Sequence, residues 1–330
     1  MDYKFVVDLD DHEGSGIADK YRYSDNGELV EVMSWVQDGE GPHYLYNVTD
    51  TVMAKTPSNQ TYDEASEMSH EHRSGFETFF IDSVLMYVYL DGVRVLVEPG
   101  DILHLQPGQQ HAMAQIESVK FRGFFHDLDA FTFGRKRKDF LEYMPEAADD
   151  PDYRAATMSK DFIKRVRPCY KDVPAETVNA IKNPKRPKAE YHFDGATVKV
   201  IIPRWEEWGV CECICAEMKK GFTAKWVKYP SSRELYYVRN GKVEFTIFNN
   251  KYVAGKASIV NIPEHAPHSV VALEDSEVYQ VHANTHWFSF LQDYESLKIN
   301  FPEKLEDPET LKELKKKFEC DIESIGMTEV

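Results

Sequence analysis

The stretch HEHRSGFE, residues 70–77, decides how this chain folds, because it spaces two histidines and a glutamate across a strand, a turn and a second strand. Residues two apart on a strand point to the same face, so His70 and His72 present adjacent imidazoles. Glu77 follows a Ser-Gly turn signal and opens the apolar run TFFI, which predicts a second strand beside the first. The stretch therefore predicts that two imidazoles and one carboxylate lie close together.

A later stretch, GDILHLQPGQQH at residues 100–111, supplies a further histidine. Its Gly-Asp turn signal, short apolar strand and Pro-Gly turn would return the chain to the same point. His111 ends the stretch and adds a third imidazole. Three histidines and one glutamate, spaced in this way in two turn-bounded stretches, predict one metal site. Its ligands would be His70, His72, Glu77 and His111.

These two stretches resemble the motifs of the cupin superfamily. The first cupin motif reads H-x-H, three or four residues, then E, and the second reads G, five residues, P-x-G, two residues, H. Gly100, Gly108 and His111 lie on the second motif. The chain departs from the family pattern at three positions that supply no ligand: Val84, Gln106 and Gln115. The resemblance implies a small antiparallel barrel of the jelly-roll type, with the four residues of the predicted site as metal ligands inside it.

A second set of short strands follows in residues 191–290, with runs such as TVKVIIP, ELYYVRN, KVEFTIF and ASIVNIP. Glu234 and the stretch that ends in His268 resemble parts of the two motifs, but Val227 and Tyr229 stand where the first two histidines would be. Two ligands are too few for a strong site, so this half is expected to be free of metal. The resemblance thus implies an all-β bicupin, with an intact N-terminal motif and a degenerate C-terminal one.

The expected domain organisation has four parts. They are an N-terminal cupin barrel with the metal site at residues 1–130, a partly helical linker at 131–190, a C-terminal cupin barrel at 191–300 and a C-terminal helix at 301–330. The first 60 residues contain the extra strands EVMSWV and HYLYNV, which would extend the first barrel's sheet or exchange with the second.

Helices are expected in the linker and near the C-terminus. Apolar spacing predicts short helices at about residues 138–144 and 175–181. Asp307 can cap a further helix, Pro308 suits its first position, and an apolar stripe follows.

Composition limits the classes of function. A length of 330 residues and an aromatic content of 13% predict about two β-rich domains. The net charge of −17 argues against nucleic acid or an anionic membrane surface as a partner, since both would repel the chain. No stretch suits a membrane span, and the acidic N-terminus does not resemble a secretory signal, so a cytoplasmic location is expected. The family resemblance adds the expectation of a homodimer and a small-molecule substrate.

Three cysteines alternate in the run GVCECICAEM and raise the question of a second metal or redox site. Alternation puts Cys211, Cys213 and Cys215 on one face of a strand. Free cysteine commonly behaves as a small buried hydrophobe, so a structural role is the preferred interpretation.

Three imidazoles and one carboxylate would hold one divalent transition metal ion, with iron, manganese, zinc, nickel and copper all compatible. Positions would stay open for water, dioxygen or a chelating substrate, and Glu77 could leave the metal to act as a base. Three functions fit: a dioxygenase, which is preferred; a non-oxidative lyase, isomerase or decarboxylase; and a non-enzymatic binding protein. Candidates for the pocket wall are Phe79, Tyr87, Tyr89, Phe121 and Phe125.

Overall fold

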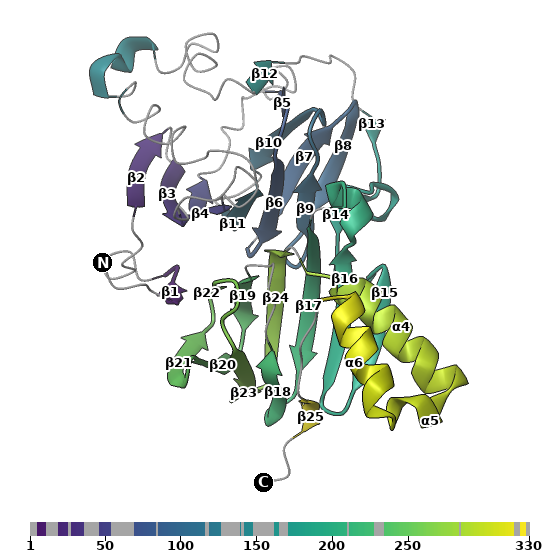
Figure 1. Ribbon diagram of the computed structural model, residues 1–330. Helices are drawn as coiled ribbons and strands as arrows, with labels where there is room; N and C mark the ends of the chain where they lie inside the picture. Colours follow the sequence, from purple (N-terminus) through teal and green to yellow (C-terminus); the bar gives the residue numbers. More distant parts are fainter. Residues whose placement is uncertain are drawn as a thin grey trace. The chain divides into compact units, whose positions relative to one another are not determined.

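The computed structural model describes residues 5–10, 19–25, 28–35, 46–53, 69–83, 85–115, 119–126, 139, 142–147, 162–164, 171–209, 211–227, 234–283, 285–319 and 324–327. The chain divides into two compact units. Ile17–Asn183 form one unit, called the N-terminal barrel below, and Met1–Gly16 with Pro184–Val330 form the other, called the C-terminal barrel. Each unit is built from two β-sheets (Figure 1).

The N-terminal barrel pairs a six-stranded sheet with a seven-stranded one. The six-stranded sheet has the order β12 (Phe162–Lys164), β5 (His70–His72), β10 (His111–Gln115), β7 (Met86–Leu90), β8 (Val93–Val97) and β13 (Lys171–Asp172). The seven-stranded sheet has the order β14 (Ile181–Lys182), β9 (Ile102–Leu105), β6 (Phe76–Ile81), β11 (Val119–His126), β4 (Tyr46–Met53), β3 (Glu28–Trp35) and β2 (Asp19–Asp25). Inward side chains of both sheets, such as Val88 and Leu103, share one apolar core.

The C-terminal barrel has the same two-sheet plan. Its seven-stranded sheet has the order β1 (Val6–Asp8), β22 (Ser258–Ile262), β19 (Glu234–Asn240), β24 (Ser276–Ala283), β17 (Glu212–Met218), β16 (Ala196–Ile202) and β15 (Ala189–Phe193). Its five-stranded sheet has the order β21 (Asn250–Gly255), β20 (Lys242–Ile247), β23 (His268–Ala272), β18 (Phe222–Val227) and β25 (Ser324–Met327). The expected all-β fold with strand-built barrels is therefore confirmed.

In the described residues, three helices lie between β24 and β25 of the C-terminal barrel: α4 (Trp287–Asn300), α5 (Pro302–Leu305) and α6 (Pro308–Lys317). The predicted start of α6 is confirmed, because the Asp307 side chain accepts a hydrogen bond from the Glu309 backbone N–H and Pro308 occupies the first turn. Helix α4 was not predicted, since its aromatic residues had been attributed to the barrel. Leu291 of α4 and Leu314 of α6 pack in one apolar cluster with strand residues of this barrel.

The sequence-based domain boundaries differ from the structure at both ends of the N-terminal barrel. Strands β12, β13 and β14 come from the predicted linker but extend the sheets of that barrel. Strand β1 pairs with β22 of the C-terminal barrel, with Val7 opposite Ile259. Each of these segments covers a strand edge whose backbone groups would otherwise lack partners. β3 and β4 extend the first barrel's sheet, as one of the two sequence-based alternatives proposed.

The helix predicted at residues 175–181 is not formed. One 3-10 turn, η3 (Ala175–Thr177), is followed by β14, in which Ile181 pairs with Leu103. Ile181 is buried, so its place in the barrel core outweighs the local helical spacing. In the other predicted linker helix, at about residues 138–144, the described residues Asp139, Glu142 and Tyr143 are helical, and the 3-10 turn η2 (Pro145–Ala147) follows them. Among the helices of the described ranges, none is long and apolar enough to cross a membrane.

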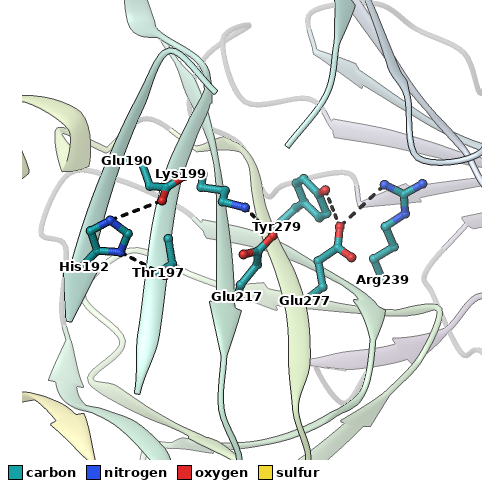
Figure 2. A network of polar contacts seen from close by, with 8 residues as sticks. All are labelled: Glu190, His192, Thr197, Lys199, Glu217, Arg239, Glu277 and Tyr279. Atoms are coloured by element: carbon teal, nitrogen blue, oxygen red, sulfur yellow. Dashed lines mark hydrogen bonds and ion pairs between the residues drawn. The ribbon is translucent and has the colours of Figure 1, made fainter. Parts of the chain in front are cut away.

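A row of polar side chains crosses five strands of the C-terminal barrel's seven-stranded sheet (Figure 2). Lys199 lies 2.6 Å from Glu217, and the Tyr279 hydroxyl donates to Glu277 at 2.5 Å. Most of these side chains are partly exposed, and an exposed ion pair contributes about 0–1 kcal/mol to the free energy of unfolding. The row therefore supports strand register and contains no metal-ligand set. Its members are Glu190, His192, Thr197, Lys199, Glu217, Arg239, Glu277 and Tyr279.

Candidate metal site

The four residues predicted as ligands lie together inside the N-terminal barrel. One ring nitrogen from each of His70, His72 and His111 lies within 4.8 Å of the others. Glu77 Oε1 is 3.4 Å from His72 Nε2, and Glu77 Oε2 is 3.1 Å from His111 Nε2. In the described part of the chain, these three histidines are the one group of histidine, cysteine or acidic side chains whose possible ligand atoms lie so close together. Glu77 is not a member of that group, but its carboxylate borders two of the three imidazoles.

Both sheets contribute to the group. His111 on β10 lies directly opposite His70 on β5, and His72, two residues along β5, points to the same face. Glu77 lies on β6, which belongs to the other sheet, so the predicted placement of this strand beside the first was wrong. Gly75, at a φ of 83°, lies in the turn that carries the chain from one sheet to the other. The carboxylate therefore approaches the imidazoles from the facing sheet.

A hydrogen bond fixes the ring of His111. Its Nδ1 lies 2.9 Å from the carbonyl oxygen of Gln109 and can donate a proton to it. In that tautomer the lone pair of Nε2 points toward Glu77 and is available to a metal ion. Metal-binding histidines commonly have their second ring nitrogen anchored in this way.

The charges around the group favour a cation. Burial alone would raise the pKa of Glu77, but the imidazoles of His72, His111 and His70 together lower it to about 2. Burial lowers the pKa of His111, and the Glu77 carboxylate outweighs that effect and raises it. A buried carboxylate among three imidazoles, with nitrogen and oxygen donors facing one another, is a donor set that suits a divalent transition metal. The residues present therefore fit such an ion.

No family profile and no curated protein matches the sequence. Among solved structures, the chain is similar to oxalate decarboxylase of Bacillus subtilis, from a structure used to study the Mn(II) centres of that enzyme. The TM-score is 0.52, and the sequence identity is 11% over 85% of this chain and 77% of that one. A tryptophan-to-tyrosine variant of the same enzyme gives a TM-score of 0.52 and 11% identity over 90% and 84% of the two chains. The chain folds as a bicupin. At this identity the likeness concerns the fold alone.

In the second barrel, the residue paired with His268 is not a possible metal ligand. Val227 lies opposite His268, just as His70 lies opposite His111 in the first barrel. Valine offers no ligand atom, which agrees with the sequence comparison. Tyr229 lies outside the described residues, so the absence of metal from this barrel stays a prediction.

Glu234 and His268 lie in this barrel as uncharged groups. Burial raises the pKa of Glu234 to about 8, although hydrogen bonds from Tyr236 and Gln280 oppose that rise. Burial lowers the pKa of His268 to about 4. Their closest atoms are 3.7 Å apart, but a protonated carboxyl and a neutral imidazole do not form an ion pair at neutral pH. In this respect the two barrels of the bicupin differ.

Glu234→Gln is expected to stabilise the protein in alkaline solution relative to wild type. The pKa of Glu234 in the folded state, about 8, lies above the value of 4.5 for an unperturbed glutamate. Between pH 4.5 and about pH 8, Glu234 is therefore protonated in the folded state and ionised in the unfolded state. The contribution of Glu234 to the free energy of unfolding therefore falls as pH rises through this window, by about 1.4 kcal/mol for each unit of pKa shift. Urea unfolding of both proteins from pH 5 to 9 measures the difference. A constant difference would show that Glu234 is ionised throughout.

Among the described residues, the candidate metal group contains none of the three alternating cysteines. Cys211, Cys213 and Cys215 are all buried. Burial raises the pKa of the Cys213 and Cys215 thiols well above the ordinary value, so neither is a thiolate at neutral pH. Thiolates are the form that binds metal, and the structural interpretation is therefore favoured.

The predicted pocket-wall aromatics separate into two groups. Phe79 and Phe121 lie in the apolar core of the N-terminal barrel and meet edge to face, with ring centroids 5.4 Å apart. Tyr87 and Tyr89 belong to a different cluster, because alternation along β7 turns them away from that core. The side chain of Phe125 lies outside the described residues.

A strand that no local sequence pattern predicts supports the ligands. Linker strand β12 pairs with β5, so that Phe162 lies opposite His72 and Lys164 lies opposite His70. No local pattern identifies this partner, since the two strands are about ninety positions apart in the sequence. The edge of the ligand strand is thereby covered by backbone hydrogen bonds.

Proposed function

We propose that this bicupin is a lyase that uses one divalent metal ion to cleave a small oxygen-rich acid, with decarboxylation as the favoured reaction class. The observation that carries the proposal is the convergence of His70, His72, His111 and Glu77 inside one barrel. The likeness to Bacillus subtilis oxalate decarboxylase supports this non-oxidative alternative over the dioxygenase preferred from the sequence.

The residues of the site have distinct parts in this proposal. The three imidazoles and Glu77 bind the ion, and the carbonyl of Gln109 holds the His111 ring in the tautomer that presents Nε2. A bound divalent ion supplies Lewis acidity, which stabilises negative charge on substrate oxygens. Glu77 is in addition the proposed proton carrier: its carboxylate faces the point where the ligand atoms converge, and it would take a proton from the bound acid and return it to the carbon that loses carbon dioxide.

Access to the site is uneven. Glu77 and His111 are buried, whereas His70 and His72 are partly exposed. The substrate would therefore approach from the side of the β5 imidazoles. The apolar core behind Glu77 and His111, with Leu105 opposite Glu77 and Leu90 opposite His111, keeps bulk water away from the buried side.

Product analysis of metal-loaded protein tests the proposal. Separate samples of metal-free protein are loaded with Mn(II), Fe(II), Zn(II), Ni(II) or Cu(II). Each sample is mixed with oxalate or with one of a panel of small 2-oxo and 2-hydroxy acids. The release of carbon dioxide and the uptake of oxygen are then measured. We expect carbon dioxide release without stoichiometric oxygen uptake. Stoichiometric oxygen uptake would instead favour the dioxygenase, and binding of acids without turnover would favour the non-enzymatic function.

Glu77→Gln separates the two parts proposed for this residue. The variant keeps the shape of the side chain but lacks the negative charge and the basicity. If Glu77 is a base as well as a ligand, turnover stays lost even at metal concentrations that saturate the variant. Turnover that returns in step with metal occupancy would leave Glu77 as a ligand alone.

A further inference from the structure

A pair of buried polar side chains joins the two strands that carry the three histidines. Gln110 Nε2 donates a hydrogen bond to Ser69 Oγ at 2.5 Å. Ser69 directly precedes His70, and Gln110 directly precedes His111. Both side chains are almost fully buried, with 0% and 2% of their surface exposed. This bond, called the Ser69–Gln110 staple below, therefore links the chain one residue before each of two ligands.

The strands that it joins share little backbone pairing. In the described register, β5 and β10 meet at a single pair, His70 with His111. By contrast, β10 pairs with β7 over five positions and is firmly part of the sheet. On its other edge β5 is paired with β12, and near its end the His72 carbonyl accepts from the Gly108 N–H at 2.7 Å. The position of β5 relative to β10 thus depends on few bonds.

The staple lies behind the ligands. Ser69 and Gln110 directly precede β5 and β10, and the alternation of these strands, continued by one residue, turns their side chains to the face opposite to the imidazoles. They occupy diagonal positions across the strand pair, a spacing that long side chains can span. The bond can therefore set the separation of His70 and His111 without occupying space in the site.

One end of the staple is anchored to a turn. The Gln110 backbone N–H donates to Asp91 Oδ1 at 3.2 Å, and the Asp91 N–H donates to the Gln110 carbonyl at 3.1 Å. Asp91 lies in the tight turn between β7 and β8, at a φ of 43°. A short chain of hydrogen bonds therefore runs from this turn through Gln110 to Ser69, the residue beside His70.

We infer that the Ser69–Gln110 staple positions the ligand strand β5, and that it raises the affinity of the site for a divalent metal. The inference rests on the metal binding proposed above. Partners that orient metal ligands from outside the coordination sphere typically change metal affinity by about 10–100-fold. Ser69 and Gln110 are therefore positioning residues, since neither side chain is among the ligands.

A double-mutant cycle with Co(II) as the probe tests the inference. Ser69→Ala, Gln110→Met and the double variant are compared with wild type by chelator competition and by the visible absorption of bound Co(II). Each single variant should lose about 10-fold in Co(II) affinity. The double variant should lose no more Co(II) affinity than the single variant that binds Co(II) less tightly, because all three variants lack the same hydrogen bond. In the double variant neither member of the Ser69–Gln110 pair stays behind without the other, so it remains informative if a single variant folds poorly.

Ser83→Ala is the matched control. The Ser83 hydroxyl accepts from the Lys120 N–H at 2.9 Å in the same barrel, away from the ligands. It should leave Co(II) affinity and the Co(II) spectrum unchanged. Three outcomes would contradict the inferred role of the staple. They are unchanged Co(II) affinity in all staple variants, additive losses of affinity in the double variant, and an equal loss of affinity in Ser83→Ala. A wild-type protein that binds no Co(II), Mn(II) or Zn(II) would overturn the proposed metal function, and the staple with it.

Discussion

His72→Ala is expected to abolish stable metal binding, whereas His268→Ala leaves it intact. His72 supplies one of the four donors that converge in the N-terminal barrel, with Nε2 3.4 Å from Glu77. Loss of a donor should cost more than the roughly 100-fold upper range seen for residues that only orient ligands. Metal content after dialysis and Co(II) titration measure the effect.

The His268→Ala variant is the matched control because His268 holds the position in the second barrel that His111 holds in the first. Its partner across the strands is Val227, and its ring is uncharged and wholly buried. Removing the ring creates a cavity and lowers stability, so metal content is expressed per folded molecule. Equal metal loss in the two variants would contradict the assignment of the site to the N-terminal barrel.

Glu212→Ala is expected to lower the free energy of unfolding by about 3 kcal/mol or more, because it orphans several buried donors. Glu212 Oε1 accepts from the Thr285 hydroxyl at 2.7 Å and from the Trp287 N–H at 2.5 Å, and Oε2 accepts from the Phe288 N–H at 3.3 Å. A carboxyl group from β17 thus caps the start of α4. Burial raises its pKa to about 7, against the lowering effect of these hydrogen bonds.

Glu217→Ala, on the same strand, is the control for Glu212→Ala. Glu217 is 45% exposed and pairs with Lys199, so its removal should cost about 0–1 kcal/mol. Urea unfolding followed by far-ultraviolet circular dichroism compares both variants with wild type at pH 8. Equal effects of the two substitutions would show that the cap on α4 adds little to the packing of the helix.

The four candidate residues could be picked out from the sequence because residue type, strand alternation and turn signals point to them, together with the resemblance to the two cupin motifs. Strand alternation puts His70 and His72 on one face, but only the pairing of β5 with β10 brings the distant His111 to them. The all-β fold followed from the same short strands and turn residues. By contrast, the sheet that holds Glu77 could not be predicted, because a turn signal does not state whether the chain stays in one sheet or crosses to the facing one.

The missed features depend on partners far away in the sequence. β12 covers the edge of β5, and β1 covers the edge of β22, across long stretches of intervening chain. The staple joins Ser69 to Gln110, two polar residues of common types that no motif singles out. Residues 175–181 have helical spacing but end in a strand, because the barrel core buries Ile181.

By itself the sequence determined the fold class and the identity of the four candidate ligands, and it predicts a degenerate second motif. These follow from residue type and from periodicities of a few residues. The tertiary structure alone decided where the barrels divide, from which sheet Glu77 approaches, and which hydrogen bonds hold β5 beside β10. The reason is physical: hydrogen bonds between distant strands and burial in a shared core arise only when the whole chain has folded.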